Sequence, residues 1–63
     1  MPIAQILILE GRTPEQRREM MRSVTHAIAE ALDADPETVR VIIQEVPAGS
    51  WGVGGLPVKE RGR

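Results

Sequence analysis

Hydrophobic patterning predicts a strand at the start of the chain. Residues 3–9, IAQILIL, form a short run rich in Ile and Leu that ends at Glu10-Gly11. A run of this length and composition is typical of a β-strand. Strict alternation fails from Ile6 to Leu9, because apolar residues fall on both faces there. A strand of this kind is covered on both sides, as in parallel sheets.

The next segment has the pattern of an amphipathic helix that begins at Pro14. Thr13 is a good N-cap, Pro14 suits the first helical position, and Gln16 completes a capping box with Thr13. Apolar residues then recur at spacings of three and four, which predicts a helix of about 19 residues with one apolar face. These residues are Met20, Val24, Ala27, Ile28, Ala31 and Leu32.

A second strand is predicted after the helix. Asp35 is placed to cap a single turn, and residues 39–46, VRVIIQEV, are again largely apolar. Strand, helix and strand in this order give one right-handed β-α-β unit with parallel strands. Residues 47–63 are rich in Gly and Pro and predict a loop with a short hairpin and a charged tail. The expected fold class is α+β (α/β), with residues 1–63 as a single domain.

The apolar residues of the two strands predict self-association. One helix covers one face of a two-stranded sheet, and the other face and both edges stay bare. A chain of 63 residues is marginal alone. It has no cysteine for disulfides and one histidine, His26, too few for a multi-histidine metal site. We therefore expect oligomeric sheets, formed by sheet joining sheet or by sheet packing on sheet.

Composition excludes several classes of partner. Eight Lys and Arg against nine Asp and Glu, with Trp51 as the one aromatic residue, do not make a nucleic-acid-binding surface. No apolar run approaches the about 18 residues of a membrane span. No basic region precedes the first apolar run and no cleavage site follows it. We expect a cytoplasmic protein without cofactor or metal and with neither nucleic acid nor membrane as a partner.

Two arginines are candidates for binding an anion. Arginine binds carboxylates through two hydrogen bonds and stays protonated at neutral pH. Arg12 follows the first strand, and Arg40 lies inside the second, where a charge is costly without a partner. The structural alternative for Arg12 is a solvated residue ahead of the helix. For Arg40 it is an ion pair with Glu45 or Glu10, or an edge residue that reaches solvent.

Pro2 is the one candidate proton carrier. If Met1 is removed, Pro2 presents a secondary amine, and an α-amino group has a reference pKa of about 8. An apolar pocket and nearby arginines disfavour the charged form and lower that pKa toward the value that suits a general base. The alternative is that Pro2 merely begins the strand.

The glycine-flanked Trp51 has two interpretations. An aromatic residue in a loop serves as the wall of a pocket or as the anchor of an interface. The sequence around it, Gly-Ser-Trp-Gly, does not favour one over the other. His26 lies off the apolar stripe of the predicted helix, which favours a surface or interface position over a catalytic one.

Four segments together resemble 4-oxalocrotonate tautomerase, a family of the tautomerase superfamily. They are PIAQILILEGR, the Thr-Pro-Glu-Gln helix start, VRVIIQEV and SWGVGG, and they cover nearly the whole chain from Pro2 onward. The resemblance implies a β-α-β unit with a small carboxy-terminal hairpin. It also implies that two units form a dimer and that three dimers form a homohexamer, which agrees with the self-association expected above.

The resemblance also implies roles for five residues. Pro2 matches an amino-terminal proline that acts as general base and then as acid. Arg12 matches an arginine that binds a substrate carboxylate. Arg40 matches one that reaches from a neighbouring subunit to the 2-oxygen and its carboxylate. Trp51 matches an aromatic pocket wall, usually Phe, and Leu9 would line the site. The implied reaction is a 1,3-type proton shift that converts a dienol such as 2-hydroxymuconate into an α,β-unsaturated ketone.

The chain departs from this family at two positions. Leu7 stands where the type enzyme has a polar histidine, and Trp51 is larger than Phe. No glutamate stands where the dehalogenase relatives use one to activate water, which disfavours hydrolytic dehalogenation. Two other functions remain open. One is a non-catalytic oligomeric binding module in which Arg40 forms an interface ion pair. The other is a decarboxylase or hydratase acting on a small unsaturated or 3-oxo acid.

Overall fold

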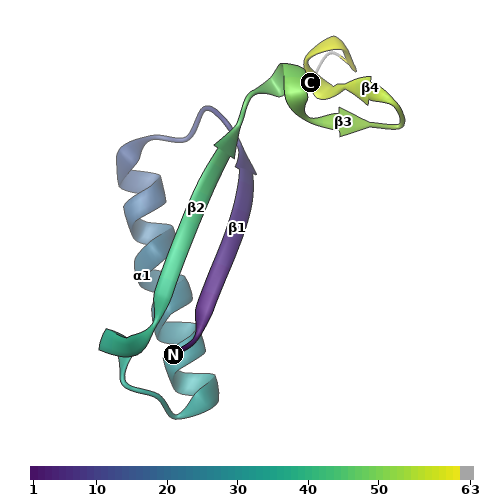
Figure 1. Cartoon of the computed structure of the whole chain (residues 1–63). Coiled ribbons are helices and arrows are strands. Elements are labelled where there is room, and N and C mark those ends of the chain that lie inside the picture. Colours follow the sequence, from purple (N-terminus) through teal and green to yellow (C-terminus); the bar gives the residue numbers. More distant parts are fainter. Residues whose placement is uncertain (62–63) are drawn as a thin grey trace.

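The predicted β-α-β unit and the carboxy-terminal hairpin are both present. The structure, a computed structural model, describes residues 1–61. Strands β1 and β2 form a parallel two-stranded sheet, α1 lies against one face of it, and β3 and β4 form an antiparallel hairpin (Figure 1). The elements are β1 (Ile3–Leu9), α1 (Pro14–Leu32), β2 (Arg40–Val46), β3 (Gly52–Val53) and β4 (Leu56–Pro57), with single 3₁₀ turns at Pro36–Thr38, Ala48–Ser50 and Val58–Arg61. None of the helices in residues 1–61 is both long and apolar enough to cross a membrane.

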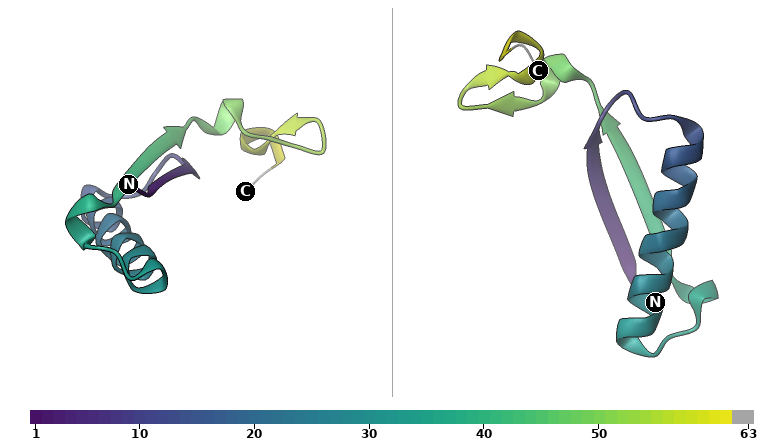
Figure 2. Two further views of the ribbon diagram at one scale, coloured as in Figure 1. Left: turned by 60° about the horizontal axis from the view of Figure 1, so that its bottom comes forward. Right: turned by 180° about the vertical axis from the view of Figure 1, so that it is seen from behind.

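The sheet has one covered face and one open face. Strand β1 pairs with β2 in an unbroken register that runs from Ile3 opposite Arg40 to Leu9 opposite Val46. Alternate residues point to opposite sides of the sheet. The open face therefore carries large apolar side chains in the single chain, and Ile3, Leu7 and Ile42 are 61%, 60% and 50% exposed. Figure 2 shows α1 on one side of the sheet and no element on the other.

The start of α1 is closed by the predicted capping box. The Thr13 hydroxyl accepts a hydrogen bond from the Gln16 N–H at 3.1 Å, and the Gln16 side-chain oxygen accepts one from the Thr13 N–H at 3.0 Å. Pro14 occupies the first turn, and Asp33 ends the helix in the left-handed region with φ of 54°. The reciprocal bonds satisfy two N–H groups that have no partner inside the helix.

Replacing Thr13 by Ala should destabilise the protein by about 1 kcal/mol, the usual cost of losing an N-cap side chain. Denaturant unfolding at a fixed protein concentration measures this loss, because self-association would make the midpoint depend on concentration. Thr13→Ser keeps the accepting oxygen and is the matched control, with stability close to that of the wild type. Equal stability of the Ala and Ser variants would show that the bond to the Thr13 hydroxyl contributes nothing.

The buried face of α1 is narrower than the predicted stripe. Met20, Val24 and Ile28 are partly buried as expected, and Ala29, which the stripe did not include, is the buried residue of the helix. The remaining predicted members of the stripe are exposed: Ala27, Ala31 and Leu32. The reason is that a sheet of two strands covers only a narrow strip of the helix surface.

Strand β2 begins one residue later than predicted. Asp35 caps the expected single turn by accepting a hydrogen bond from the Glu37 N–H at 3.0 Å. Val39 ends this turn, because its N–H donates to the Pro36 carbonyl at 3.1 Å instead of to a strand. Its side chain is buried nevertheless. The predicted strand therefore differs from β2 only at Val39, which belongs to the end of the turn.

The isolated chain has little interior. The hairpin projects beyond the carboxyl end of the sheet (Figure 1), and the radius of gyration is 14.6 Å. A compact chain of this length would have a radius of about 11 Å. Within residues 1–60, the buried apolar side chains are those of Ala29, Val39 and Val58. An extended shape with so small a core is consistent with a subunit that completes its core against further copies.

Candidate active site

A cavity of about 450 Å³ lies at the carboxyl end of the sheet, beside the first turn of α1. Strand β1 and the helix contribute most of its apolar wall, and three polar side chains come from the connection between them and the helix start. The lining residues are Leu7, Ile8, Leu9, Arg12, Gln16, Arg17, Met20 and Trp51. Three of the five predicted site residues, Leu9, Arg12 and Trp51, therefore meet in one place.

Arg12 is the arginine of this cavity that has no side-chain partner among residues 1–61. It lies in the short connection between β1 and α1, directly after Gly11, whose φ of +116° is in the region that favours glycine. The Arg12 side chain is exposed, and within residues 1–61 its guanidinium forms neither a hydrogen bond nor an ion pair. A guanidinium in this state is available to bind an anion.

Trp51 reaches the cavity because the chain after β2 is tied back to the end of β1. The Glu10 N–H donates to the Val46 carbonyl at 3.0 Å, and the Glu10 carboxylate accepts a hydrogen bond from the Ala48 N–H at 3.1 Å. Beyond this junction the Trp51 carbonyl accepts a bond from the Val58 N–H at 2.7 Å, which links it to the hairpin. The half-buried indole is thus placed as a wall of the cavity, one of its two predicted roles.

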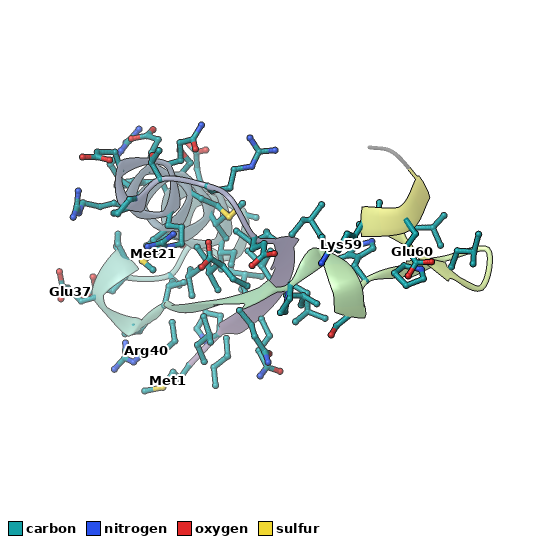
Figure 3. All side chains as sticks on the ribbon, turned by 90° about the horizontal axis from the view of Figure 1, so that it is seen from above. Met1, Met21, Glu37, Arg40, Lys59 and Glu60 are labelled. Atoms are coloured by element: carbon teal, nitrogen blue, oxygen red, sulfur yellow. The ribbon has the colours of Figure 1, made fainter. Side chains whose placement is uncertain are left out.

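Pro2 and Arg40 lie together at the opposite end of the sheet. The Arg40 N–H donates to the Pro2 carbonyl at 2.9 Å, which extends the ladder by one bond beyond the paired strands. In Figure 3, Met1 and Arg40 are at the same end of the sheet, whereas Lys59 and Glu60 lie beyond the other end, in the 3₁₀ turn that follows the hairpin. Neither Pro2 nor Arg40 lines the cavity that contains Arg12.

The ion pair considered for Arg40 is not formed among residues 1–61. Its guanidinium donates to the Glu37 carbonyl at 2.9 Å, and its side chain is exposed. Both proposed carboxylate partners are engaged elsewhere. Glu45 forms an ion pair with Arg17, and Glu10 accepts a hydrogen bond from the Ala48 N–H. The solvent-facing alternative therefore describes Arg40 in the single chain.

One chain cannot bring Pro2 and Arg12 to the same small substrate. Between them lies all of β1, which has seven residues. At about 3.3 Å per residue this strand spans roughly 23 Å. A site that uses the Pro2 nitrogen and the Arg12 guanidinium together must therefore combine groups from different copies of the chain.

Arg17 is a cavity residue that the sequence did not single out. Its Nη1 atom donates to the Glu45 carboxylate and to the Arg12 carbonyl, each at 2.9 Å. The side chains of Arg17 and Glu45 are 30% and 36% exposed, so the pair is partly shielded from water. The sequence did contain a sign that Arg17 has a specific partner. It stands three residues before Met20, so this charged residue falls on the apolar face of the helix.

Other electrostatic features lie outside the cavity. On the outer surface of α1, hydrogen bonds from Arg22 and then from Ser23 lower the pKa of Glu19, and the bond to Glu19 raises the pKa of Arg22. Both charged groups are fully exposed, so water and salt screen their attraction. Within residues 1–61 no three His, Asp or Glu side chains gather closely enough to hold a metal ion.

The chain matches known proteins over nearly its whole length. The model of the family described as tautomerase enzyme matches residues 2–61. A 2-hydroxymuconate tautomerase from Pseudomonas putida is 49% identical over 63 residues, which is 100% of both chains. A protein of the same name from Stutzerimonas stutzeri is 52% identical over 63 residues, again 100% of both chains.

Solved structures show the same backbone. A 4-oxalocrotonate tautomerase isozyme from Methylibium petroleiphilum superposes with a TM-score of 0.94 at 50% identity, covering 98% of this chain and 100% of the other. A heterohexamer 4-oxalocrotonate tautomerase from Chloroflexus aurantiacus gives a TM-score of 0.92 at 45% identity, covering 95% and 97%. Agreement of this extent in sequence and in backbone shows that the chain belongs to the tautomerase family and is an isomerase.

Proposed function

We propose that this chain catalyses the ketonisation of a small dienol carboxylate such as 2-hydroxymuconate, with the amino group of Pro2 as base and then as acid. The observation that carries the proposal is the guanidinium of Arg12, which lines a largely apolar cavity and has no partner among residues 1–61. The close relatives named 2-hydroxymuconate tautomerases support this choice of substrate. The amine becomes available when Met1 is removed.

The proposed reaction moves one proton. The Pro2 nitrogen takes the proton of the 2-hydroxyl group, and the oxygen electrons form the new carbonyl while the diene electrons shift along the chain. The Pro2 ammonium then returns the proton to C5, which leaves a C3–C4 double bond conjugated with the ketone. Counted from the hydroxyl oxygen, this is a 1,5 transfer and not the 1,3-type shift that the resemblance implies. Arg12 holds the carboxylate far from the reacting oxygen. Arg40 stabilises the negative charge that develops on the 2-oxygen, as preorganised donors do. No cofactor is needed for this transfer.

The site is proposed to form between subunits of a homohexamer built as a trimer of dimers. Pro2 of one subunit would face Leu9, Arg12 and Trp51 of a second, with Arg40 reaching in from a neighbour. The separation of Pro2 from Arg12 along β1 supports a shared site, and the bare apolar face of the sheet supports further assembly. A hexameric relative of known structure supports the subunit number.

The chemistry of the substrate also suggests where the enzyme works. A six-carbon dienol dicarboxylate is the kind of product that oxidative opening of an aromatic ring supplies. We therefore place the enzyme in the degradation of aromatic compounds and in the cytoplasm. The relatives named 2-hydroxymuconate tautomerases support the substrate on which this placement rests.

Arg12→Ala tests the proposed function. The substitution removes a charge-assisted pair with the substrate carboxylate, worth about 1.5–3 kcal/mol. We expect kcat/KM for 2-hydroxymuconate to fall about 10- to 100-fold. Steady-state absorbance of the dienol measures the rate. Arg18→Ala removes the same charge from an exposed helix position outside the cavity and serves as the control. A wild-type kcat/KM in Arg12→Ala would contradict the proposal.

A further inference from the structure

We propose that Arg17 is a positioning residue that fixes the backbone carrying Arg12 and thereby aims Arg12 at the substrate carboxylate. The inference rests on the proposed function of Arg12. It adds a residue for which the sequence indicated no role. Arg17 would act without touching the substrate, through two hydrogen bonds that it donates to the protein.

Nothing in the Arg12 side chain itself fixes its direction. The preceding residue, Gly11, has φ of +116° and lies in open space, because a methyl group added to it would meet no atom within 4 Å beyond its chain neighbours. No packing around Gly11 therefore holds the chain that leads into Arg12. The guanidinium of Arg12 has no protein partner within residues 1–61. The direction of this side chain therefore depends on how firmly its own backbone is held.

The peptide group that follows Arg12 is held at both of its polar atoms. Its carbonyl oxygen accepts a hydrogen bond from Arg17 Nη1 at 2.9 Å, and its N–H, which belongs to Thr13, donates to Gln16 at 3.0 Å. Both partners project from the first turn of α1 and line the cavity. Two bonds at opposite ends of one planar group set its orientation, and with it the backbone from which the Arg12 side chain extends.

The same nitrogen of Arg17 anchors this arrangement to the sheet. Nη1 also donates to the Glu45 carboxylate at 2.9 Å, and Glu45 is the β2 partner of Ile8 in the register. A single nitrogen of a helix residue therefore links α1 to the β1–α1 connection and to strand β2. The ion pair with Glu45 also balances the charge of Arg17. Among residues 1–61, this leaves Arg12 as the cavity cation without a protein partner, available to bind an anion.

The first experiment measures KM and kcat for 2-hydroxymuconate in Arg17→Ala. Loss of one charge-assisted hydrogen bond to the Arg12 backbone should raise KM about tenfold. We expect kcat to stay within about twofold, because Arg17 does not touch the reacting atoms. Arg17→Lys should restore KM, since one Lys nitrogen has three donors and a single Arg17 nitrogen makes both bonds. Arg18→Ala is the matched control, and sedimentation checks that each variant assembles.

A double-mutant cycle separates positioning from a general structural effect. If Arg17 acts through Arg12, Arg17→Ala should cause little further loss in a chain that already carries Arg12→Ala. Losses that simply add would overturn the inference. So would full recovery of KM in Arg17→Ala/Glu45→Gln, because the effect would then come from the unpaired Glu45 charge.

A binding measurement keeps this inference distinct from the proposed chemistry. Calorimetric titration with adipate, a non-reacting six-carbon dicarboxylate, should show the same loss of affinity in Arg17→Ala and the same recovery in Arg17→Lys. An unchanged affinity in Arg17→Ala would overturn the positioning role. Failure of Pro2 as the base would instead appear as activity that persists when its amine is blocked, with the adipate result unaffected.

Discussion

A chain in which Met1 is retained before Pro2 should assemble normally and show almost no ketonisation of 2-hydroxymuconate. With Met1 in place, the Pro2 nitrogen is a tertiary amide and has no basic lone pair. Loss of a general acid–base group costs about 10²- to 10⁴-fold in rate. We expect kcat to fall by at least this factor. Intact mass measures whether Met1 is present, and the dienol absorbance measures turnover on the same sample.

The comparison needs a chain blocked in a controlled way. An amino-terminal extension that is not trimmed supplies it, and Pro2→Ala is the matched variant that keeps a free but primary and less rigid amine. We expect activity in the order trimmed wild type, Pro2→Ala, blocked chain. The Arg40 N–H bonds to the Pro2 carbonyl and not to its nitrogen, so the fold should tolerate the block. Wild-type turnover by a blocked chain of verified mass would exclude Pro2 as the base.

Ile42→Asp should dissociate the assembly and abolish activity with it. Ile42 is 50% exposed on the open face of the sheet, where Ile3 and Leu7 are 61% and 60% exposed. If this face is buried against other copies, the new carboxylate is buried without a partner, which costs more than the about 2–7 kcal/mol of an unpaired neutral polar group. On a solvated face the same change would cost within about 0.5 kcal/mol. Sedimentation velocity measures the size of the assembly.

A charge placed elsewhere provides the control for that result. Ala27 is exposed on α1, and Ala27→Asp introduces the same carboxylate away from the sheet. We expect Ala27→Asp to keep both the assembly and the activity. Loss of activity should follow loss of assembly in Ile42→Asp, because Pro2 and Arg12 lie at opposite ends of β1. A dissociated Ile42→Asp chain with full activity would show that one chain holds a complete site.

Local signals were sufficient for the elements of secondary structure. The start of α1 was predicted to the residue because Thr13, Pro14 and Gln16 act within a single turn. The length and the Ile- and Leu-rich composition of residues 3–9 identified β1, because both are properties of the segment itself. The prediction failed where a partner far along the chain decides the outcome. Leu32 fits the helical period and is exposed, because the period carries no information on how wide the facing sheet is.

The amino-acid pattern alone was enough to predict strands that are apolar on two faces, and it singled out Pro2, Arg12 and Arg40 as candidates for the proposed chemistry. Which of these groups lie close together depends on how the chain folds. The parallel register sets Pro2 beside Arg40 and leaves Arg12 with Leu9 and Trp51 at the far end. It also brings Glu45 to Arg17 across 28 positions of sequence. Such pairings follow from how strands align in space, and spacing along the chain does not encode that alignment.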